Sequence, residues 1–505
     1  MPQHHPTAPR GSDLAPRSVF LEGRYGRMFR DLPPLEIAET DLGKLDEVAA
    51  SMLESKESGE DEQLDTLLDG TIPAGFTYLG QFIDHDITFD PVSSLQRLQD
   101  PDGLRDFRTP RLDLDSLYGD GPNNNPFMYD PDVDNGKTTF LIGKNEADED
   151  DLPRNTLGRS SQGWPRGRAL IGDPRNDENI IVSQLHLLFL KFHNKVVEVV
   201  RKRFPGLEGD DLFIEAQRVT RWHYQWLVVH DFLRRVVGKA VIKDILVEQT
   251  YTAGGGAVGR RRDVKLLFYS WRREPFMPVE FSAAAYRFGH SMIRGDYRLN
   301  KTTEDEIPIF TRGRLLIEKG DLRGFRPLPS GFAVDWSFFF EVGDAGNLQR
   351  ARKIDTKLVE RLRYVSAVDP PNALAVRNLR RGRALGLPTG ERVAQAMGLE
   401  PILIPALGST RFGGLFDGRA PLWYYILREA EVLGRGQRLG PVGGRIVAEV
   451  LLGLLKGDRF SYVNDPTWEP HLPAAKSGTF TLADLVTFTL GPQPGSAPSQ
   501  YPEQT

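Results

Sequence analysis

Long helical periodicity in the middle of the chain constrains its fold more than any other feature. Apolar residues recur at the i, i+3, i+4 and i+7 spacing of an amphipathic helix through segment 185–200, and a second such segment covers 212–237. Shorter helices are expected near 81–84, 281–293, 357–364 and 442–455. Alternating strand patterns are sparse. We therefore expect a mainly α protein with little β structure.

The rest of the organisation follows from composition along the chain. The 50 glycines and 36 prolines indicate long, irregular connections between helices. No composition break or internal repeat divides residues 21–492, so we expect one large helical domain there. Residues 1–20 are rich in Pro, Ser and His and are expected to form a flexible arm, and residues 493–505 a disordered tail.

Charge and residue usage exclude several classes of function. The chain has no cysteine, which excludes disulfides, thiolate-ligated haem, iron–sulfur clusters and cysteine zinc sites. A net charge of -5 argues against nucleic-acid or membrane-surface partners. The N-terminus lacks the apolar core of a signal peptide, and no apolar run would span a bilayer. We expect a cytoplasmic monomer that binds neither nucleic acid nor membranes, with secretion lacking a recognisable signal peptide as the open alternative.

Two histidines stand out from the other seven. His85 lies in GQFIDHDITFDP, and if this segment is helical, Gln81, Asp84 and His85 share one face. An amide, a carboxylate and an imidazole on one face among apolar neighbours would be costly as plain core. His290 lies in FSAAAYRFGHSMIR, where small residues would let a flat group approach. For a lone histidine the commoner alternative is a hydrogen-bonded core residue.

The spaced pairs His186/His193 and His223/His230 are interpreted as buried core histidines. Carboxylate-bridged metal bundles use Glu-x-x-His, and no histidine here has Glu three residues before it.

Five segments, in this order, resemble the animal haem peroxidase family, within the peroxidase–cyclooxygenase superfamily, as a bacterial-type member. They are GQFIDHD, TPRLDLDSLYG, GDPRNDE, YRFGH and NLRRGRALGLP. In the family these are the distal helix, the calcium loop, the catalytic-arginine segment, the proximal helix and the segment that supports the proximal histidine. The resemblance extends over roughly residues 70–490 and implies that 21–492 is a haem peroxidase domain.

The resemblance implies a role for each matching residue. His290 would be the axial ligand of the haem iron, and Asn378 would accept a hydrogen bond from its other ring nitrogen. His85 would be the distal general base that moves a proton between the oxygens of peroxide. Arg175 would stabilise negative charge as the O–O bond breaks, and Gln81 would order water or halide above the iron.

Other residues would hold the haem, expected to be haem b. Asp84 and Glu178 stand where family members form ester bonds to haem methyl groups. Arg287 and Arg381 would pair with the propionates, for which guanidinium geometry is suited. A solvated basic face is the alternative for the segment around Arg381. Asn179 stands where some relatives place a vinyl-linked methionine, which implies little chloride oxidation.

A calcium site is expected beside the distal helix. Thr109, Arg111, Asp113 and Asp115 alternate along a segment that we expect to be extended, so they would point the same way. In the family the Asp that follows the distal histidine, here Asp86, completes the site. Carboxylate, hydroxyl and carbonyl oxygens suit Ca²⁺, with Arg111 offering only its main-chain oxygen. The alternative is a polar turn with solvated aspartates.

The implied function is the reduction of hydrogen peroxide to water, through a ferryl intermediate, in a response to oxidative stress. Small donors such as phenols, dyes, iodide, bromide or thiocyanate would be oxidised. One alternative is a haem-dependent fatty-acid dioxygenase, but these enzymes place a radical-forming Tyr three residues before the proximal histidine, where this chain has Arg287. Tyr286 is one residue away and is expected to point elsewhere. The other alternative is a non-catalytic haem-binding domain, which would be expected to lose His85 or Arg175.

Overall fold

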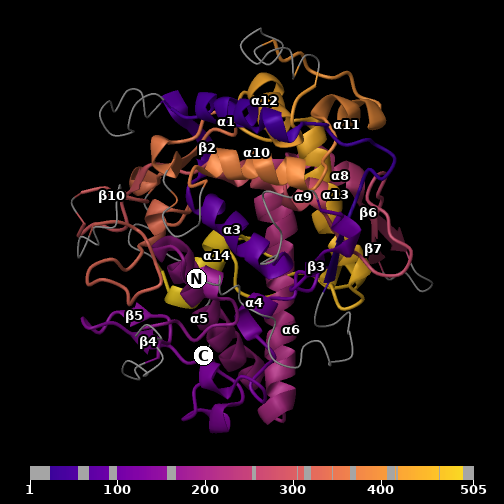
Figure 1. Cartoon of the computed structure of the whole chain (residues 1–505). Helices are drawn as coiled ribbons and strands as arrows, with labels where there is room; N and C mark the ends of the chain where they lie inside the picture. The colour runs from indigo at the N-terminus through magenta and orange to yellow at the C-terminus, as the bar shows by residue number, and fades with distance from the viewer. Residues whose placement is uncertain are drawn as a thin grey trace.

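Helices dominate the described part of the chain (Figure 1). The computed structural model describes residues 23–54, 67–89, 99–155, 167–252, 258–303, 305–311, 320–343, 345–363, 365, 371–405, 416, 419–465 and 467–492. The expected arm (1–20) and tail (493–505) lie outside these residues. The α-helices are α1 (Leu42–Ser51), α3 (Gly75–Ile87), α4 (Asp115–Tyr118), α5 (Ile180–Arg203), α6 (Gly209–Leu227), α7 (Arg234–Val236), α8 (Lys239–Ile245), α9 (Val279–Ser282), α10 (Leu374–Ala384), α11 (Gly390–Ala396), α12 (Leu422–Gly434), α13 (Pro441–Gly457) and α14 (Leu482–Leu490).

Short 3₁₀ helices and one π-helical turn connect or extend these helices. The π-helical turn is η6 (Val228–Leu233). The 3₁₀ helices are η1 (Glu39–Asp41), η2 (Pro101–Gly103), η3 (Pro126–Met128), η4 (Asp134–Gly136), η5 (Pro174–Asp177), η7 (Ala285–His290), η8 (Trp336–Phe338), η9 (Ala345–Asn347), η10 (Glu360–Arg363) and η12 (Tyr462–Asn464).

The strands are short, with two to seven residues each. They are β1 (Gly23–Gly26), β2 (Asp69–Pro73), β3 (Arg105–Asp106), β4 (Gly143–Lys144), β5 (Asp150–Asp151), β6 (Leu246–Thr252), β7 (Val258–Val264), β8 (Met277–Pro278), β9 (Asp296–Tyr297), β10 (Ile307–Pro308) and β11 (Arg350–Arg352). β1 pairs antiparallel with β3 and parallel with β8, and the remaining strands form two-stranded pairs such as the β6–β7 hairpin. The mainly α fold with little β structure is confirmed.

The two long periodic segments form the helices that the sequence predicts. α5 begins after Asn179, whose side chain accepts a hydrogen bond from the Ile181 N–H, and ends in a basic turn at 201–203, as the helix dipole favours. α6 continues through η6 into α7, so helical structure covers Gly209–Val236 without a break. α5 packs against α6 and also against α3, most of whose residues are buried. α3 and α13 likewise confirm the helices expected near 81–84 and 442–455.

Two helix predictions are wrong in form. Segment 281–293 is not one α-helix, because α9 ends at Ser282 and the chain continues as the 3₁₀ helix η7. The Ser282 carbonyl accepts from Arg287 Nε at 2.9 Å, which replaces a main-chain helical bond. In the described residues 357–363, helical turns occur only at Glu360–Arg363, because Leu358 forms a bridge with Leu53 that keeps the chain extended before it.

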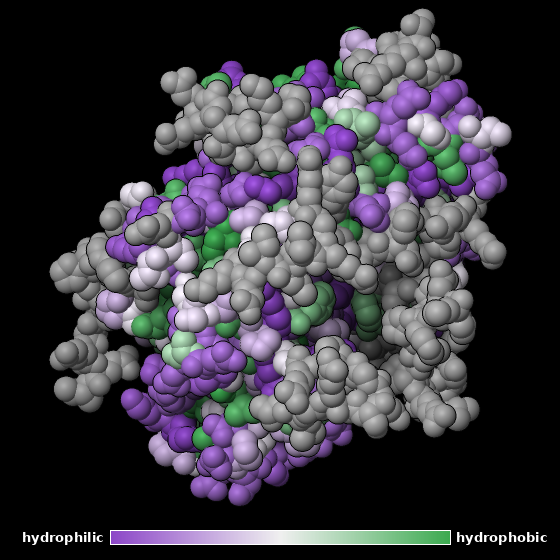
Figure 2. Space-filling view, turned by 60° about the vertical axis from the view of Figure 1, so that its left-hand side comes forward, coloured by the Kyte–Doolittle hydropathy of each residue, from purple (hydrophilic) through white to green (hydrophobic). Residues whose placement is uncertain are grey.

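Helices α1, α10, α12 and α14 were not predicted from periodicity. α1 lies along α10, and α10 also contacts α12 (Figure 1). On the face in Figure 2, hydrophilic residues cover most of the described surface and hydrophobic ones show as smaller areas among them. Within the described residues, no helix has both the length and the apolar character needed to cross a membrane.

Candidate functional site: a cavity with two histidines

A cavity of about 450 Å³ lies where α3 and η7 meet. Its volume is in the range of roughly 300–1,000 Å³ that is common for ligand and cofactor sites. α3 contributes Gln81, Asp84 and His85, and η7 contributes residues 286–290. The single face predicted for these three α3 residues is therefore confirmed. Aromatic and aliphatic side chains cover much of the remaining wall, including Phe232 of η6.

The hydrogen bonds around His85 determine which of its ring nitrogens is the base. Asn176 Nδ2 lies 3.0 Å from His186 Nδ1, and Asn176 Oδ1 lies 2.8 Å from His85 Nδ1. Burial lowers the pKa of His186 to about 3, so this imidazole is neutral and its Nδ1 can accept from the amide. The Asn176 oxygen then accepts from His85 Nδ1–H, which leaves the His85 Nε2 lone pair free for the cavity. The sequence analysis missed Asn176 and assigned His186 to the core.

Two carboxylates line the cavity beside His85. Glu178 accepts a short hydrogen bond from Gln81 Nε2, and its Oε1 lies 3.9 Å from His85 Nε2. Asp84 accepts from Thr88 Oγ1 at 3.1 Å. Asp177, the residue that could be confused with Glu178 in the sequence, instead forms two 2.8 Å bonds to Arg154.

Arg175 lies behind His85 and is not one of the side chains that line the cavity. Its Nη2 donates to the carbonyls of His85 and Thr88 at 3.0 and 2.7 Å, and its guanidinium lies 4.5 Å from the centre of the Phe89 ring. Burial alone would lower the pKa of Arg175, but Asp173 more than offsets this and the pKa is raised, so the side chain stays cationic. In this arrangement Arg175 supports the last turn of α3, which carries His85.

A buried carboxylate, Asp173, joins Arg175 to the expected calcium loop. It accepts from Arg175 Nη2 at 2.8 Å and from Arg108 Nη2 at 2.6 Å. Arg108 Nη1 also lies 3.4 Å from Asp115. Burial alone would raise the pKa of Asp173, but the two cations hold it well below its usual value. No motif in the sequence marked Arg108, and Asp173 lies in the GDPRNDE segment but was given no role there.

The proximal wall is built around His290. Its Nδ1 lies 2.7 Å from Asn378 Nδ2, so the partner is the residue that the sequence predicts, but the amide donates to the ring instead of accepting from it. Asn378 Oδ1 accepts from Arg287 Nη1 at 3.4 Å. Within the described residues no hydrogen-bond partner is found for His290 Nε2, and a Cβ at Gly289 would meet nothing within 4 Å. Burial, followed by the Arg287 cation, lowers the pKa of His290 to about 3, so the ring is neutral and can act as a ligand.

The two expected propionate arginines lie near each other, but only one lines the cavity. Arg287 lines it and donates Nε–H to Ser282 O at 2.9 Å. Burial, followed by the charge of Arg381, lowers the pKa of Arg287 to about 10. A neighbouring anion would offset the repulsion between the Arg287 and Arg381 cations. Tyr286 also lines the cavity with its buried hydroxyl unpartnered within the described structure, so the expectation that it points elsewhere is wrong. The 3₁₀ geometry of η7 changes the angular spacing on which that expectation depended.

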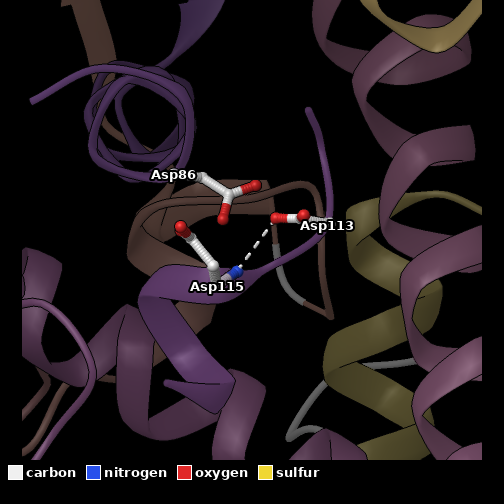
Figure 3. A group of neighbouring side chains, drawn as sticks. All are labelled: Asp86, Asp113 and Asp115. Atoms are coloured by element: carbon white, nitrogen blue, oxygen red, sulfur yellow. Dashed lines mark hydrogen bonds between the residues drawn. The ribbon is translucent and has the colours of Figure 1, made fainter. Parts of the chain in front are cut away.

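Three aspartates converge beside α3 (Figure 3). One carboxylate oxygen from each of Asp86, Asp113 and Asp115 lies within 4.8 Å of the other two. Burial, then the charges of Asp115 and Asp113, raises the pKa of Asp86 well above its usual value. Asp115 Oδ1 is buried and has no hydrogen-bond partner in the described structure. Three converging carboxylates, one of them with an orphaned oxygen, suit a hard divalent cation.

The loop reaches this geometry in a different way from the one expected. The segment is not extended throughout, because Leu114 adopts a left-handed conformation (φ 59°) and Asp115 is the first residue of α4. Thr109 Oγ1 donates to Asp113 at 2.9 Å, which keeps the threonine in the cluster. The Arg111 side chain instead lies 4.0 Å from Glu274.

A neutral histidine that contacts an amide beside an open volume fits a flat cofactor with one axial position. A family model described as animal haem peroxidase matches residues 96–403. The chain therefore belongs to the animal haem peroxidase family, as its motifs indicated. The matched region includes Arg175, His290 and Asn378, whereas the helix that carries His85 precedes it.

Curated relatives are peroxidases of low identity. Mouse thyroid peroxidase is 24% identical over 405 residues, covering 75% of this chain and 41% of the relative. Human eosinophil peroxidase is 25% identical over 311 residues, covering 58% of this chain and 39% of the relative. Heme peroxidase 2 of Caenorhabditis elegans is 24% identical over 312 residues, covering 58% and 40%. The chain thus matches about two-fifths of the length of these relatives.

Solved structures share the fold. Peroxidase A from Dictyostelium discoideum superposes with a TM-score of 0.61 at 16% identity and covers 95% of both chains. Fatty acid alpha-dioxygenase from Oryza sativa superposes with a TM-score of 0.54 at 15% identity, covering 92% of this chain and 79% of that one.

Proposed function

We propose that this chain is a haem peroxidase that reduces hydrogen peroxide to water and oxidises small donors such as phenols, dyes or iodide. The observation that carries the proposal is the shared cavity of His85 and His290, one with a free Nε2 base and the other anchored by Asn378. Haem held through His290 would supply the redox chemistry of peroxide reduction.

The residues of the chain would move and orient protons around that chemistry. His85 Nε2 takes a proton from one oxygen of peroxide and returns it to the departing oxygen, so that water leaves. Gln81 and Glu178, hydrogen-bonded to each other, hold solvent beside His85. Arg175 keeps a positive charge behind the distal histidine and fixes its main chain.

Replacing the distal base tests this proposal. His85→Gln should slow the reaction with peroxide by about 10²–10⁴-fold, the usual contribution of a general base. Stopped-flow absorbance of the haem-loaded protein measures this step separately from donor oxidation. His471→Gln, which alters a histidine outside the cavity-lining set, is the matched control. Parent-like rates in His85→Gln would refute the assignment.

We also propose that Asp86, Asp113 and Asp115 bind calcium with help from Thr109 and the main-chain oxygen of Arg111. The orphaned Asp115 oxygen and the raised pKa of Asp86 support this. We further propose that Asp84 and Glu178 can form ester bonds to haem methyl groups, because both carboxylates line the cavity.

A fatty-acid dioxygenase is the second candidate, and one observation favours it. The Tyr286 hydroxyl is buried, unpartnered among the described residues and part of the cavity wall. Oxygen uptake with a long-chain fatty acid, lost in Tyr286→Phe while peroxide-dependent donor oxidation remains, would establish this activity. No oxygen uptake in the haem-loaded parent would exclude it.

A further inference from the structure

A loop at residues 321–326 forms part of the cavity wall, and no family motif or functional argument above accounts for it. The loop is fixed to the segment that carries Glu178. The N–H of Gly324 donates to Glu178 O at 3.0 Å, and the N–H of Phe325 donates to Asp177 O at 2.6 Å. A Cβ at Gly324 would lie 1.8 Å from Asp177 O, so only glycine permits this approach. The loop is therefore a fixed part of the distal wall.

Phe325 is held in this loop at a cost to the fold. Its φ is 54°, a left-handed conformation that Gly or Asn adopts far more readily than Phe. Its side chain is 55% exposed and lines the cavity. Neither burial nor backbone preference explains an aromatic residue here. Its ring is available for contact with a molecule that enters the cavity.

Two arginines flank Phe325 and also line the cavity. Arg323 donates to Thr311 O at 2.6 Å and has the Asp321 carboxylate 3.3 Å from its Nε. Arg326 donates to two main-chain carbonyls, of Arg323 and Asp321, at 3.1 and 2.7 Å. Within the described residues, no carboxylate lies within ion-pair distance of Arg326. The Asp321 carboxylate acts on this cation only from beyond ion-pair distance, so the charge of Arg326 is incompletely neutralised beside an exposed aromatic ring.

We propose that this loop binds small phenols that carry a carboxylate, with the ring against Phe325 and the carboxylate on Arg326. Phe310, also in the wall, offers a second aromatic contact. The inference rests on the proposed function, for which these phenols would be donors. Two phenols each lose one electron and one proton, and peroxide takes up both, so that 2 ArOH + H₂O₂ gives 2 ArO• + 2 H₂O.

A matched pair of donors tests the charge preference. The acid 3-(4-hydroxyphenyl)propionate and the amine tyramine have similar phenol rings and opposite charges. We expect a higher kcat/KM for the acid, and Arg326→Gln should raise KM for the acid by about tenfold, as expected for one charge-assisted hydrogen bond. In Arg326→Gln, the kcat for the acid and both kcat and KM for tyramine should change little.

A second variant tests the aromatic contact. Phe325→Asn places a residue that tolerates the left-handed backbone and should raise KM for both phenols.

Arg272→Gln is the control, because it removes the same charge from an exposed arginine that does not line the cavity. A haem propionate is the other carboxylate that Arg326 could bind. If Arg326→Gln lowers haem content or shifts the Soret band, the partner is the propionate and the proposal is wrong. An equal rise in KM for the acid and for the amine in Arg326→Gln would also overturn the proposal.

Calorimetry without peroxide separates this inference from the proposed function. The non-oxidisable 3-phenylpropionate should bind the haem-loaded parent and bind Arg326→Gln about tenfold more weakly. If the parent oxidises no donor but this difference holds, the proposed function fails and the binding site stands. If donors such as iodide are oxidised but 3-phenylpropionate binds parent and variant equally, the site fails alone.

Discussion

Asp173→Asn should strongly destabilise the protein although it removes no atom from the core. Asp173 is fully buried and accepts hydrogen bonds from Arg108 and Arg175 at 2.6 and 2.8 Å. Asn has nearly the same shape but no charge, so both guanidinium groups would lose their shared counter-ion. Breaking a buried pair in this way costs about 3–5 kcal/mol. The variant should also perturb the main chain at His85, because Arg175 donates to that carbonyl.

The pH dependence of this penalty follows from the pKa of Asp173. The folded-state pKa lies well below the usual value because Arg175 and Arg108 favour the carboxylate over the effect of burial. The stabilisation is therefore fully present above the unfolded-state pKa of about 3.9 and is lost as pH falls toward the folded-state pKa. The difference between parent and variant should stay constant from pH 8 to 5 and shrink below about pH 4.

Denaturant unfolding followed by far-UV circular dichroism, at several pH values, measures this difference. Asp132→Asn, at an exposed aspartate, is the control and should change stability by no more than about 0.5 kcal/mol. A penalty for Asp173→Asn below about 1 kcal/mol at pH 7, or one that grows as pH falls, would refute the counter-ion argument.

Other predictions concern the cofactor, the ion and the halide. His290→Ala should lose haem, seen as a lost Soret band, and a parent spectrum in the variant would show that another residue ligates the iron. Removing calcium with a chelator should lower the melting temperature of the parent but not of Asp113→Asn, and equal shifts in both would contradict the site. After turnover with peroxide, the intact mass of the parent under denaturing conditions should include haem, and an apoprotein mass would exclude both esters. Partial attachment in Asp84→Ala and in Glu178→Ala, with none in the double variant, would support two esters. Because Asn179 cannot form the sulfonium link to a haem vinyl group that a methionine forms in some relatives, iodide should be oxidised readily and chloride very little. Triiodide formation measures iodide oxidation, and a hypochlorous acid assay measures chloride oxidation.

The sequence by itself determined those helices whose apolar pattern can be recognised within one or two helical turns. Apolar periodicity located α5, α6 and α13, because a helix that buries one face repeats every 3.6 residues. The same spacing brought Gln81 and His85 to one face of α3. The periodicity argument failed at η7, a 3₁₀ helix in which the Arg287 side chain bonds to the Ser282 carbonyl.

Contacts between distant segments decided the rest of the site. Asp113 and Asp115 converge on Asp86 because Leu114 adopts a left-handed conformation that the residue type does not favour. Asp173 joins Arg175, two residues after it, to Arg108, which lies 65 residues before it in the chain. The orientation of a side chain thus depends on which partners the fold brings within hydrogen-bond distance, and only the tertiary structure contains that information.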